Sequence, residues 1–271
     1  MLETGLYLIS SPIGNLKDIT LRALEVLEKV DVLYAEDTRV TKKLLSHYQI
    51  NRELYPYYEY NEEEVLNELL KHLEKGLSVG YISDAGTPGV SDPGYGLIKN
   101  VKGLYRVISI PGPSAVLAAL VSSGLPIQPF TFIGFLDRKK AAREKTLKQY
   151  QDLTHTLVFY ERKDRLVSLI KELYQLYGNR KITIARELTK KFETIYHYEL
   201  KDEIEIELKG EFVLIVEGAK AEQITETEIV QALKKYLNKG YLKKTAILKV
   251  SEELQVNKNE VYQIAIRKVK K

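Results

Sequence analysis

The sequence predicts an α/β protein of two domains, with a parallel-rich sheet in the first and a mixed sheet in the second, followed by a small helical module. Three observations support this fold class. In the first half of the 271 residues, strand-like apolar runs alternate with helix-like periods, which is typical of a parallel sheet covered by helices. The second half is richer in strand-like runs. The last segment contains helical periods joined by short turns.

The first domain is expected to comprise residues 1–124. Apolar runs predict strands at 5–10, 31–35, 77–82 and 105–110. Apolar residues three and four positions apart predict helices at 19–30, 38–48 and 61–75, and an apolar helix is expected at 114–123. Asp18 or Thr20 is expected to cap the first helix.

The second domain is expected to comprise residues 125–223. Pro126 and Pro129, the last prolines of the chain, mark the boundary before it. A helix is predicted at 164–177, among strands at 130–136, 155–161, 181–187, 193–200 and 211–217. This strand-rich pattern predicts a mixed sheet.

Residues 224–271 are expected to form the helical module, with helices at 226–238, 243–254 and 258–269. Asn257 is expected to cap the last helix, and the spacing resembles a helix-turn-helix arrangement. A capping or dimerisation bundle explains the spacing equally well. The module holds eleven Lys and Arg against five Glu, whereas the rest of the chain holds 30 basic and 32 acidic residues of the totals of 41 and 37. This basic tail indicates either a polyanionic partner or solvated lysine faces.

The composition is that of an ordinary globular protein, with 44% hydrophobic and 29% charged residues. Cysteine is absent, which excludes disulfides, thiolate nucleophiles and cysteine-ligated metal centres. The amino-terminal segment has an acidic residue at position 3 and only a short apolar run, so it is predicted to be neither a signal peptide nor a membrane span. We therefore expect a cytoplasmic protein without a membrane partner.

Glycine and proline concentrate in three predicted loops, at 11–16, 83–96 and 111–115. These 25 residues hold six of the 16 Gly and five of the 8 Pro. Each loop follows a predicted strand, and the carboxyl ends of parallel strands share the sheet edge where α/β proteins bind ligands. Glycine lets the backbone approach a ligand closely, and proline orders the loop before binding. The loops therefore predict one binding crevice.

The loop motifs also limit the ligand. Neither G-x-G-x-x-G nor G-x-x-x-x-G-K-[ST] occurs, so no pyrophosphate cradle or nucleoside triphosphate loop is predicted. A ligand with an adenosine and an amino acid end but no phosphate suits loops with small hydroxyls such as Ser83 and Ser114. S-adenosylmethionine is such a ligand.

Seven motifs carry a resemblance to a known family. They are LYLISSPIGNLKDITLRAL (6–24), AEDTR (35–39), SDAGTPGVSDPG (83–94), IPGPSA (110–115), GFL (134–136), ARELTK (185–190) and GEFVLIVEG (210–218). In this order they resemble the tetrapyrrole (corrin/porphyrin) methylase superfamily, and within it the small-subunit ribosomal RNA cytidine-2′-O-methyltransferase I family. AEDTR and DAGTPG are similar to the RNA branch rather than to the tetrapyrrole-modifying enzymes. The basic helical tail is also similar to the terminal module of that branch.

The resemblance implies a homodimer of two-domain protomers that binds S-adenosylmethionine in the cleft between the domains. It implies methylation of a cytidine ribose in the decoding region of small-subunit ribosomal RNA, with the RNA itself or the assembled 30S subunit as substrate. The residues implied to bind the methyl donor are Pro12, Ser83, Asp84, Gly86, Val90, Ser114, Ala115, Tyr160 and Glu187.

The chain departs from the family pattern in YERKDR, residues 160–165. The family usually has tyrosine-glutamate-serine-proline-histidine-arginine at this place, so Tyr160, Glu161 and Arg165 are retained but the proline and histidine are lost. A mechanism that depends on that histidine is therefore not expected here.

Methyl transfer from a sulfonium is an in-line displacement that depends mainly on positioning and needs no metal. A ribose 2′-hydroxyl is a poor acid, so a nearby carboxylate should assist as a general base. Glu36 and Asp37 are the candidates, with Asn15 as an orienting group. Alternatively, the two carboxylates only cap the helix from residue 38 and pair with Arg39. Glu187 and Lys190 are the candidates from the second domain.

Basic residues near the crevice and in the tail are the candidates for RNA phosphate contacts, which should weaken with salt. They are Arg39, Lys190, Lys243, Lys244, Lys258, Arg267 and Lys268.

Two other functions remain open from the sequence. One is methylation of a tetrapyrrole or another small molecule, for which the basic tail would be dispensable. The other is a DNA-binding regulator whose body senses a nucleoside ligand and transfers no methyl group.

Overall fold

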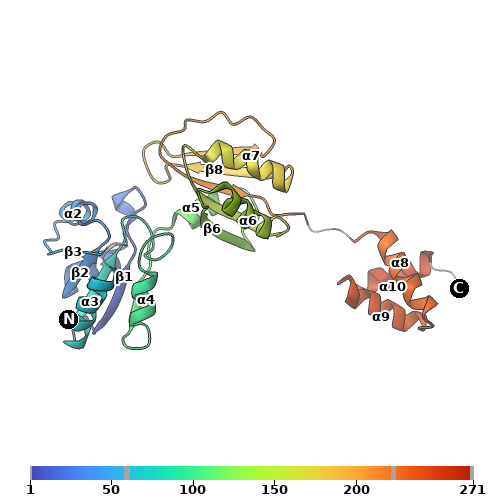
Figure 1. Ribbon diagram of the computed structural model, residues 1–271, viewed down its shortest axis with the longest axis horizontal. Coiled ribbons are helices and arrows are strands. Elements are labelled where there is room, and N and C mark those ends of the chain that lie inside the picture. The colour runs from blue at the N-terminus through green and yellow to red at the C-terminus, as the bar shows by residue number, and fades with distance from the viewer. Residues whose placement is uncertain (1, 58–61, 221–223, 269–271) are drawn as a thin grey trace. The chain divides into compact units, whose positions relative to one another are not determined.

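The computed structural model describes residues 2–57, 62–220 and 224–268, and it divides the chain into two compact units, 1–219 and 220–271 (Figure 1). The first unit contains both sheets. The predicted division of this unit at residue 124 stays a prediction. Among the described helices, none combines the length and the apolar character that crossing a bilayer requires.

The first sheet has five strands in the order β3-β2-β4-β1-β5, and every neighbouring pair is parallel. The strands β2 and β4 are buried along their whole length, which explains why they read as continuous apolar runs. The strands are β1 (Gly5–Ile9), β2 (Val32–Ala35), β3 (Tyr55–Pro56), β4 (Ser78–Ile82) and β5 (Val107–Ile110).

Helices cover both faces of this sheet. Leu33 and Ala35 pack with α1 (Leu21–Lys29) and α2 (Thr38–His47) on one face. Val32 and Tyr34 pack with the helices of the other face, α3 (Glu62–Glu74) and α4 (Tyr95–Val101). Alternate residues of β2 therefore pack in two different cores, because successive side chains of a strand point to opposite faces of the sheet.

Thr20 caps α1, because its hydroxyl accepts a hydrogen bond from the backbone N–H of Ala23 at 3.1 Å. Asp18 lies instead in a short 3-10 helix, η1 (Leu16–Asp18). The helix α4 was not predicted, and the loop predicted at 83–96 ends earlier because α4 begins at Tyr95. Position 61, the predicted start of the third helix, lies outside the described residues.

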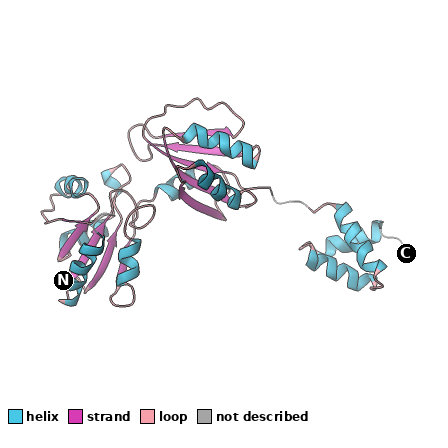
Figure 2. Ribbon diagram, in the orientation of Figure 1, coloured by secondary structure: helices cyan, strands magenta, loops and turns pink. Residues whose placement is uncertain are grey.

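The second sheet is mixed, with the order β6-β7-β10-β8-β9. Only β6 and β7 are parallel, whereas the other neighbours are antiparallel. Figure 2 shows this sheet beside its helices. The strands are β6 (Phe130–Phe135), β7 (Thr156–Arg162), β8 (Lys181–Arg186), β9 (Thr194–Glu199) and β10 (Glu211–Val216).

Helices also cover both faces of the second sheet. The helices α6 (Lys140–Tyr150) and α7 (Leu166–Tyr177) share a core with β7, β8 and β10. The helix α5 (Ala115–Ser122) packs on the opposite face, and Ile13 from the loop after β1 joins the same apolar cluster. The predicted boundary at 124 assigned α5 to the first domain, but its apolar contacts lie on the second sheet.

The second unit consists of α8 (Glu226–Asn238), α9 (Lys243–Glu253) and α10 (Lys258–Lys268) around its own apolar core. A capping box joins Thr225 and Glu228 at the start of α8. The Asn257 side chain accepts a hydrogen bond from the backbone N–H of Asn259 at 2.9 Å, as expected of a cap of the last helix. The predicted α/β fold class with a terminal helical module is confirmed.

Candidate active site

The three glycine- and proline-rich loops lie at one edge of the first sheet, as predicted. They follow β1, β4 and β5, which are neighbours in the sheet and parallel. Two backbone hydrogen bonds join the first two loops: Ser11 N donates to Gly86 O at 2.9 Å, and Gly86 N donates to Ser11 O at 3.1 Å. The loops therefore form one connected rim.

The loop from 83 to 94 folds back over the end of β4. Gly86, Gly89 and Gly94 have φ angles of +80°, +81° and +127°, which side chains rarely adopt. The Tyr81 hydroxyl donates to Pro93 O at 3.1 Å, and a Cβ on Gly94 would lie 3.0 Å from the Tyr81 ring. Glycine is therefore required where the loop passes the tyrosine.

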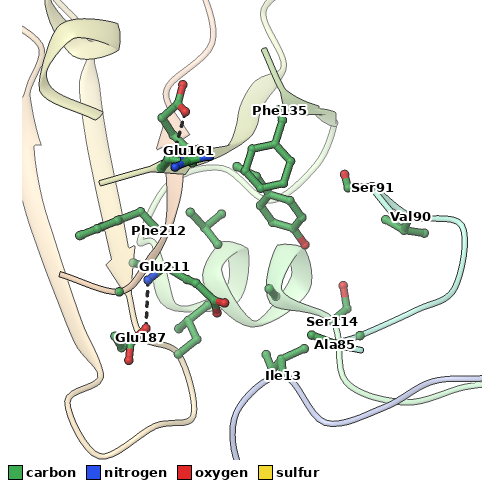
Figure 3. Close-up of a pocket in the computed structure, with 18 of the residues that line it drawn as sticks. Ile13, Ala85, Val90, Ser91, Ser114, Phe135, Glu161, Glu187, Glu211 and Phe212 are labelled. Carbon is green, nitrogen blue, oxygen red and sulfur yellow. Dashed lines mark hydrogen bonds between the residues drawn. The ribbon is translucent and has the colours of Figure 1, made fainter. Parts of the chain in front are cut away.

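A cavity of about 600 Å³ lies between these loops, the start of α5 and the second sheet (Figure 3). Ala85 and Ser114 form part of the side made by the loops, and Phe212 and Glu211 form part of the side made by the second sheet. A volume of this size lies within the range of about 300–1,000 Å³ that is usual for small-molecule sites.

Six of the nine residues predicted to bind the methyl donor line this cavity, and so does Lys190. Pro12, Ser83 and Asp84 lie outside the lining. Ser83 is buried, and its hydroxyl donates to Gly86 O at 3.2 Å, so it stabilises the loop without lining the cavity. The six lining residues are Gly86, Val90, Ser114, Ala115, Tyr160 and Glu187.

The cavity also contains residues that the sequence analysis did not select. Several belong to quoted motifs: Ser91 and Asp92 to the loop after β4, and Phe212 and Val213 to β10. The two motifs therefore identify the segments that line the cavity. Which of their side chains line the cavity depends on the loop conformation.

The proposed catalytic carboxylates Glu36 and Asp37 also lie outside the lining. Asp37 caps α2 by accepting from Arg39 N at 2.8 Å, and it pairs with the Arg39 guanidinium at 2.6 Å. These hydrogen bonds lower the Asp37 pKa to about 2. Glu36 accepts from Asp84 N at 3.1 Å, and the Asp84 carboxylate accepts from Asp37 N at 3.0 Å. Asp37 thus makes the contacts of the capping alternative. Glu36 does not, and it instead anchors the loop after β4 to the end of β2.

Asn15 connects the loop after β1 to the ARELTK segment. Its side chain accepts from Lys17 N at 3.1 Å, and its backbone N–H donates to the Thr189 hydroxyl at 3.0 Å. A Cβ on Gly14 would lie 2.5 Å from Cγ of Lys190, so the Lys190 stem lies directly on this glycine.

Glu187 has a φ of +50° and bends its carboxylate back over the start of β10. Its Oε1 accepts from Glu211 N at 2.9 Å and from the Lys190 ammonium at 3.0 Å. The Lys190 ammonium also pairs with the Glu211 carboxylate at 2.9 Å. Although partial burial acts in the other direction, these hydrogen bonds hold the Glu187 pKa below its usual range. Glu187 is therefore ionised and paired with Lys190.

Two other carboxyl groups are shifted the opposite way. Burial, and then the charge of Glu36, raise the pKa of Asp84 to about 6. The same two causes, with Asp84 as a third, raise the pKa of Asp92 to about 7. Burial and the nearby Asp92 raise the pKa of Tyr160 to about 12. Shifts of this kind are common at functional sites.

The retained part of YERKDR has a structural role. Glu161 is buried, and its carboxylate accepts from Arg162 N at 2.8 Å and from the Arg165 guanidinium at 2.9 Å. Arg165 also donates to Leu136 O at 2.9 Å. This pair holds the end of β7 against the residues that follow β6.

The candidates for RNA contact fall into both units. Arg39 is exposed, with 86% of its side chain accessible. In the second unit, Lys243 and Lys244 begin α9 and Lys258 begins α10, whereas Arg267 pairs with Glu226 at 3.0 Å. Lys268 pairs with the same glutamate at 2.9 Å. RNA-binding roles for these residues stay predictions.

The described residues include no group of three or more His, Cys, Asp and Glu that could hold a metal ion.

Known proteins resemble this chain in sequence and in fold. Residues 5–203 match the family model described as Tetrapyrrole (Corrin/Porphyrin) Methylases. The chain is 41% identical over 271 residues to Ribosomal RNA small subunit methyltransferase I of Halalkalibacterium halodurans, with 96% of this chain and 93% of the relative covered.

Two solved structures illustrate the likeness of fold. The methyltransferase CobJ is 20% identical, with a TM-score of 0.62 over 82% of this chain and 97% of that chain. A uroporphyrin-III C-methyl transferase from Thermus thermophilus, complexed with S-adenosyl homocysteine, is also 20% identical, with a TM-score of 0.55 over 78% of this chain and 96% of that chain. The two-sheet fold expected from the motifs is thus confirmed.

Proposed function

We propose that this chain, which belongs to the ribosomal RNA small subunit methyltransferase I family of the tetrapyrrole (corrin/porphyrin) methylases, methylates small-subunit ribosomal RNA. S-adenosylmethionine is the methyl donor, and the ribose 2′-hydroxyl of a cytidine in the decoding region is the acceptor. The observation that supports this activity most strongly is the cavity of about 600 Å³ where loops from three adjacent parallel strands meet the second sheet.

The cavity walls suit an adenosine ligand without phosphate. Ala85, Gly86 and Ala115 present little or no side chain, so a ligand can approach the backbone closely. Ile13 and Leu188 supply apolar surface of the kind that a purine ring covers. When bound, the donor supplies a methyl group on a positively charged sulfur.

The charge of the cavity also suits a cationic ligand. Five carboxylates line it against three basic side chains, and such a balance attracts a sulfonium. The carboxylates are Asp92, Glu161, Asp164, Glu187 and Glu211, and the basic residues are Arg162, Lys163 and Lys190.

The choice of RNA as acceptor rests on the relatives and on the tail. A match to 96% of the chain must include most of residues 220–271, so the relative named for ribosomal RNA methylation has a segment that aligns with the basic module. The substrate is either the RNA itself or the assembled 30S subunit, and it places the protein in the cytoplasm.

We also propose that the protein acts as a homodimer. Leu117 and Val121 lie one helical turn apart on α5 and remain 53% and 68% exposed, which is unusual for one face of an apolar helix. A second copy would cover this face. Light scattering should give twice the mass of one chain, and the mass of a single chain would refute the dimer.

The activity is tested by filling the cavity. Ala115→Phe should abolish binding of S-adenosylmethionine in calorimetry, because the ring occupies the space next to Ser114. Ala141→Phe is the matched control, because Ala141 is exposed on α6 and does not line the cavity. Equal donor binding by both variants would contradict this site.

The acceptor is identified by transfer of labelled methyl groups to 30S subunits or to free small-subunit RNA, followed by mapping of 2′-O-methylation. Label in one cytidine of the decoding region is expected. Label only in a tetrapyrrole would favour the small-molecule alternative, and donor binding without any transfer would favour the nucleoside-sensing regulator.

A further inference from the structure

The turn between β8 and β9, residues 187–193, presents an aromatic ring to solvent. The side chain of Phe192 is 61% exposed, and it belongs to none of the apolar clusters formed by the described residues. Its neighbour Lys191 is exposed as well. A single exposed apolar residue is common on protein surfaces, so the setting of the ring decides whether it has a role.

Hydrogen bonds from a buried arginine fix the backbone at Phe192. Its carbonyl oxygen accepts from the Arg186 guanidinium at 3.4 Å and from the Thr194 hydroxyl at 3.2 Å. Arg186 is 5% exposed, and its guanidinium also donates to Lys209 O at 2.8 Å and pairs with Glu207 at 2.9 Å. The ring is therefore carried by an ordered segment, so little conformational entropy is lost when a partner contacts it.

The turn is also connected to the cavity and to the loop after β1. Thr189 has a φ of +64°, which is strained for a residue with a side chain. Its hydroxyl accepts from Asn15 N at 3.0 Å, and its backbone N–H donates to the Glu193 carboxylate. Lys190 lines the cavity, and Phe192 follows it by two residues, which is at most about 7 Å of extended backbone. The ring therefore lies near the cavity wall without lining it.

The charge beside the ring suits a nucleic acid. The Lys191 ammonium lies 5.5 Å from the centre of the Phe192 ring, within the distance of a cation–π contact. In the part of the chain that the structure describes, neither Lys191 nor the exposed Lys17, two residues after Asn15, forms an ion pair. Lysine is depleted in protein–protein interfaces, whereas lysines beside an exposed ring are typical of proteins that bind single-stranded nucleic acid.

We propose that Phe192 stacks on an unpaired base of the small-subunit RNA next to the nucleotide that enters the cavity, and that Lys191 contacts a phosphate of the same strand. This inference rests on the proposed function. Phe192 is a positioning residue, since its ring takes no part in methyl transfer and instead holds the neighbouring nucleotide. Unpaired RNA is recognised in this way because each base offers a flat face to an aromatic ring.

The first measurement is the KM for the RNA substrate, with 30S subunits or free small-subunit RNA, whichever the wild type methylates. Phe192→Leu keeps an apolar side chain but removes the ring, so KM should rise about 5- to 150-fold, as for the loss of one stacked base. The kcat should stay the same, because the ring binds substrate and transition state equally. Phe192→Trp keeps a ring, so its KM should stay within about threefold of the wild-type value.

Tyr174→Leu is the matched control, because Tyr174 is 45% exposed on α7 and does not line the cavity. Its KM should equal that of the wild type. Neither variant of Phe192 should change the Kd for S-adenosylmethionine, because the ring does not line the cavity. A wild-type KM in Phe192→Leu, or a KM raised equally in Phe192→Trp, would overturn the stacking role.

The salt dependence of RNA binding separates the lysine from the ring. Lys191→Ala should lower the slope of log K against log salt by roughly 0.7, the effect of one lost phosphate contact on a single strand. Phe192→Leu should weaken binding without a change in slope, because it removes no charge. An unaltered slope in Lys191→Ala would overturn the phosphate contact.

Crosslinking identifies the partner of the ring. In place of Phe192, p-benzoylphenylalanine keeps an aromatic side chain and reacts under light with the group that it contacts. We expect a crosslink to small-subunit RNA within a few nucleotides of the methylated cytidine. A crosslink to a ribosomal protein instead would overturn this inference and leave the proposed function intact. A wild type that neither binds the donor nor methylates RNA would refute both.

Discussion

At the scale of single residues, the carboxyl groups at and near the cavity have pKa values that are shifted in opposite directions. Glu187 and Glu211 share the Lys190 ammonium, and its hydrogen bond to Glu187 helps to hold the pKa of that carboxyl below its usual range. The pKa values of Asp84 and Asp92 are shifted upward instead, because burial and the neighbouring Glu36 disfavour their charged forms. Burial therefore raises carboxyl pKa values in the loop after β4, whereas hydrogen bonds lower the pKa of Glu187 near Lys190.

These raised pKa values predict how stability depends on pH. Asp84 and Asp92 have pKa values of about 6 and about 7 in the folded protein, against about 3.9 for an unfolded aspartate. Between about pH 4 and 7 the folded state binds more protons than the unfolded state, so their contribution to the unfolding free energy falls as the pH rises.

The substitution Asp92→Asn removes one of these two contributions. Urea unfolding should show that the variant is more stable than the wild type at pH 8 and equally stable near pH 4. A variant that is less stable than the wild type at pH 8 would show that the Asp92 carboxylate has a stabilising partner.

At the scale of elements, the segment after β8 contacts the turn into β10 so closely that only glycine fits at position 210. Gly210 has a φ of +90°, and a Cβ there would lie 2.3 Å from Cδ of Glu187. The carboxylate of Glu187 thus lies directly over the turn that leads into β10. The conformation of the ARELTK segment and that of β10 are therefore coupled.

Gly210→Ala should lower the unfolding free energy by about 1–3 kcal/mol, through backbone strain and displacement of Glu187. It should also weaken binding of S-adenosylmethionine, because Glu187 and Gly210 both line the cavity. Gly178→Ala is the matched control, because Gly178 has a φ of +69° but no atom within 4 Å of an added Cβ. Both variants introduce backbone strain, but only Gly210→Ala also introduces a steric clash with Glu187. Urea unfolding measures the two free energies of unfolding, and an equal decrease in both variants would exclude a contribution from the clash.

At the scale of the whole molecule, the two units have separate cores. The apolar clusters of the first unit contain no residue beyond 216, and the cluster of the second unit begins at Ile224. The basic module can therefore form or lose contacts with a partner while the packing around the cavity stays the same.

Removal of residues 220–271 should leave the affinity for S-adenosylmethionine unchanged and weaken binding to ribosomal RNA. The loss should be largest at low salt, because each lost phosphate contact lowers the slope of log K against log salt by roughly 0.7–0.9. Filter binding at several salt concentrations measures this slope, and Lys244→Ala with Lys258→Ala should reproduce part of the change. RNA binding with an unaltered slope would exclude the module as an RNA contact.

Much of the fold could be predicted from local patterns. Residues in β2 alternate between two cores, and those in α1 recur three and four apart, because each element buries particular faces. The short helix α4 was missed because seven residues that follow a glycine-rich loop carry little periodicity. The helix α6 was missed because only Leu147 is buried in it, which leaves a largely polar sequence.

The sequence by itself determined the two sheet types, the helical module and the three loops that meet at one rim, because hydrophobic period and turn chemistry are local properties. Only the tertiary structure decided which side chains face the cavity. Glu36 and Asp37 follow a strand as a catalytic pair would, yet they anchor a loop and cap α2, whereas Asp92 enters the cavity wall through the left-handed Ser91 and the contact with Gly134. Burial and the charges of residues distant in sequence set the pKa of a carboxyl group, so these pKa shifts arise only when the chain has folded.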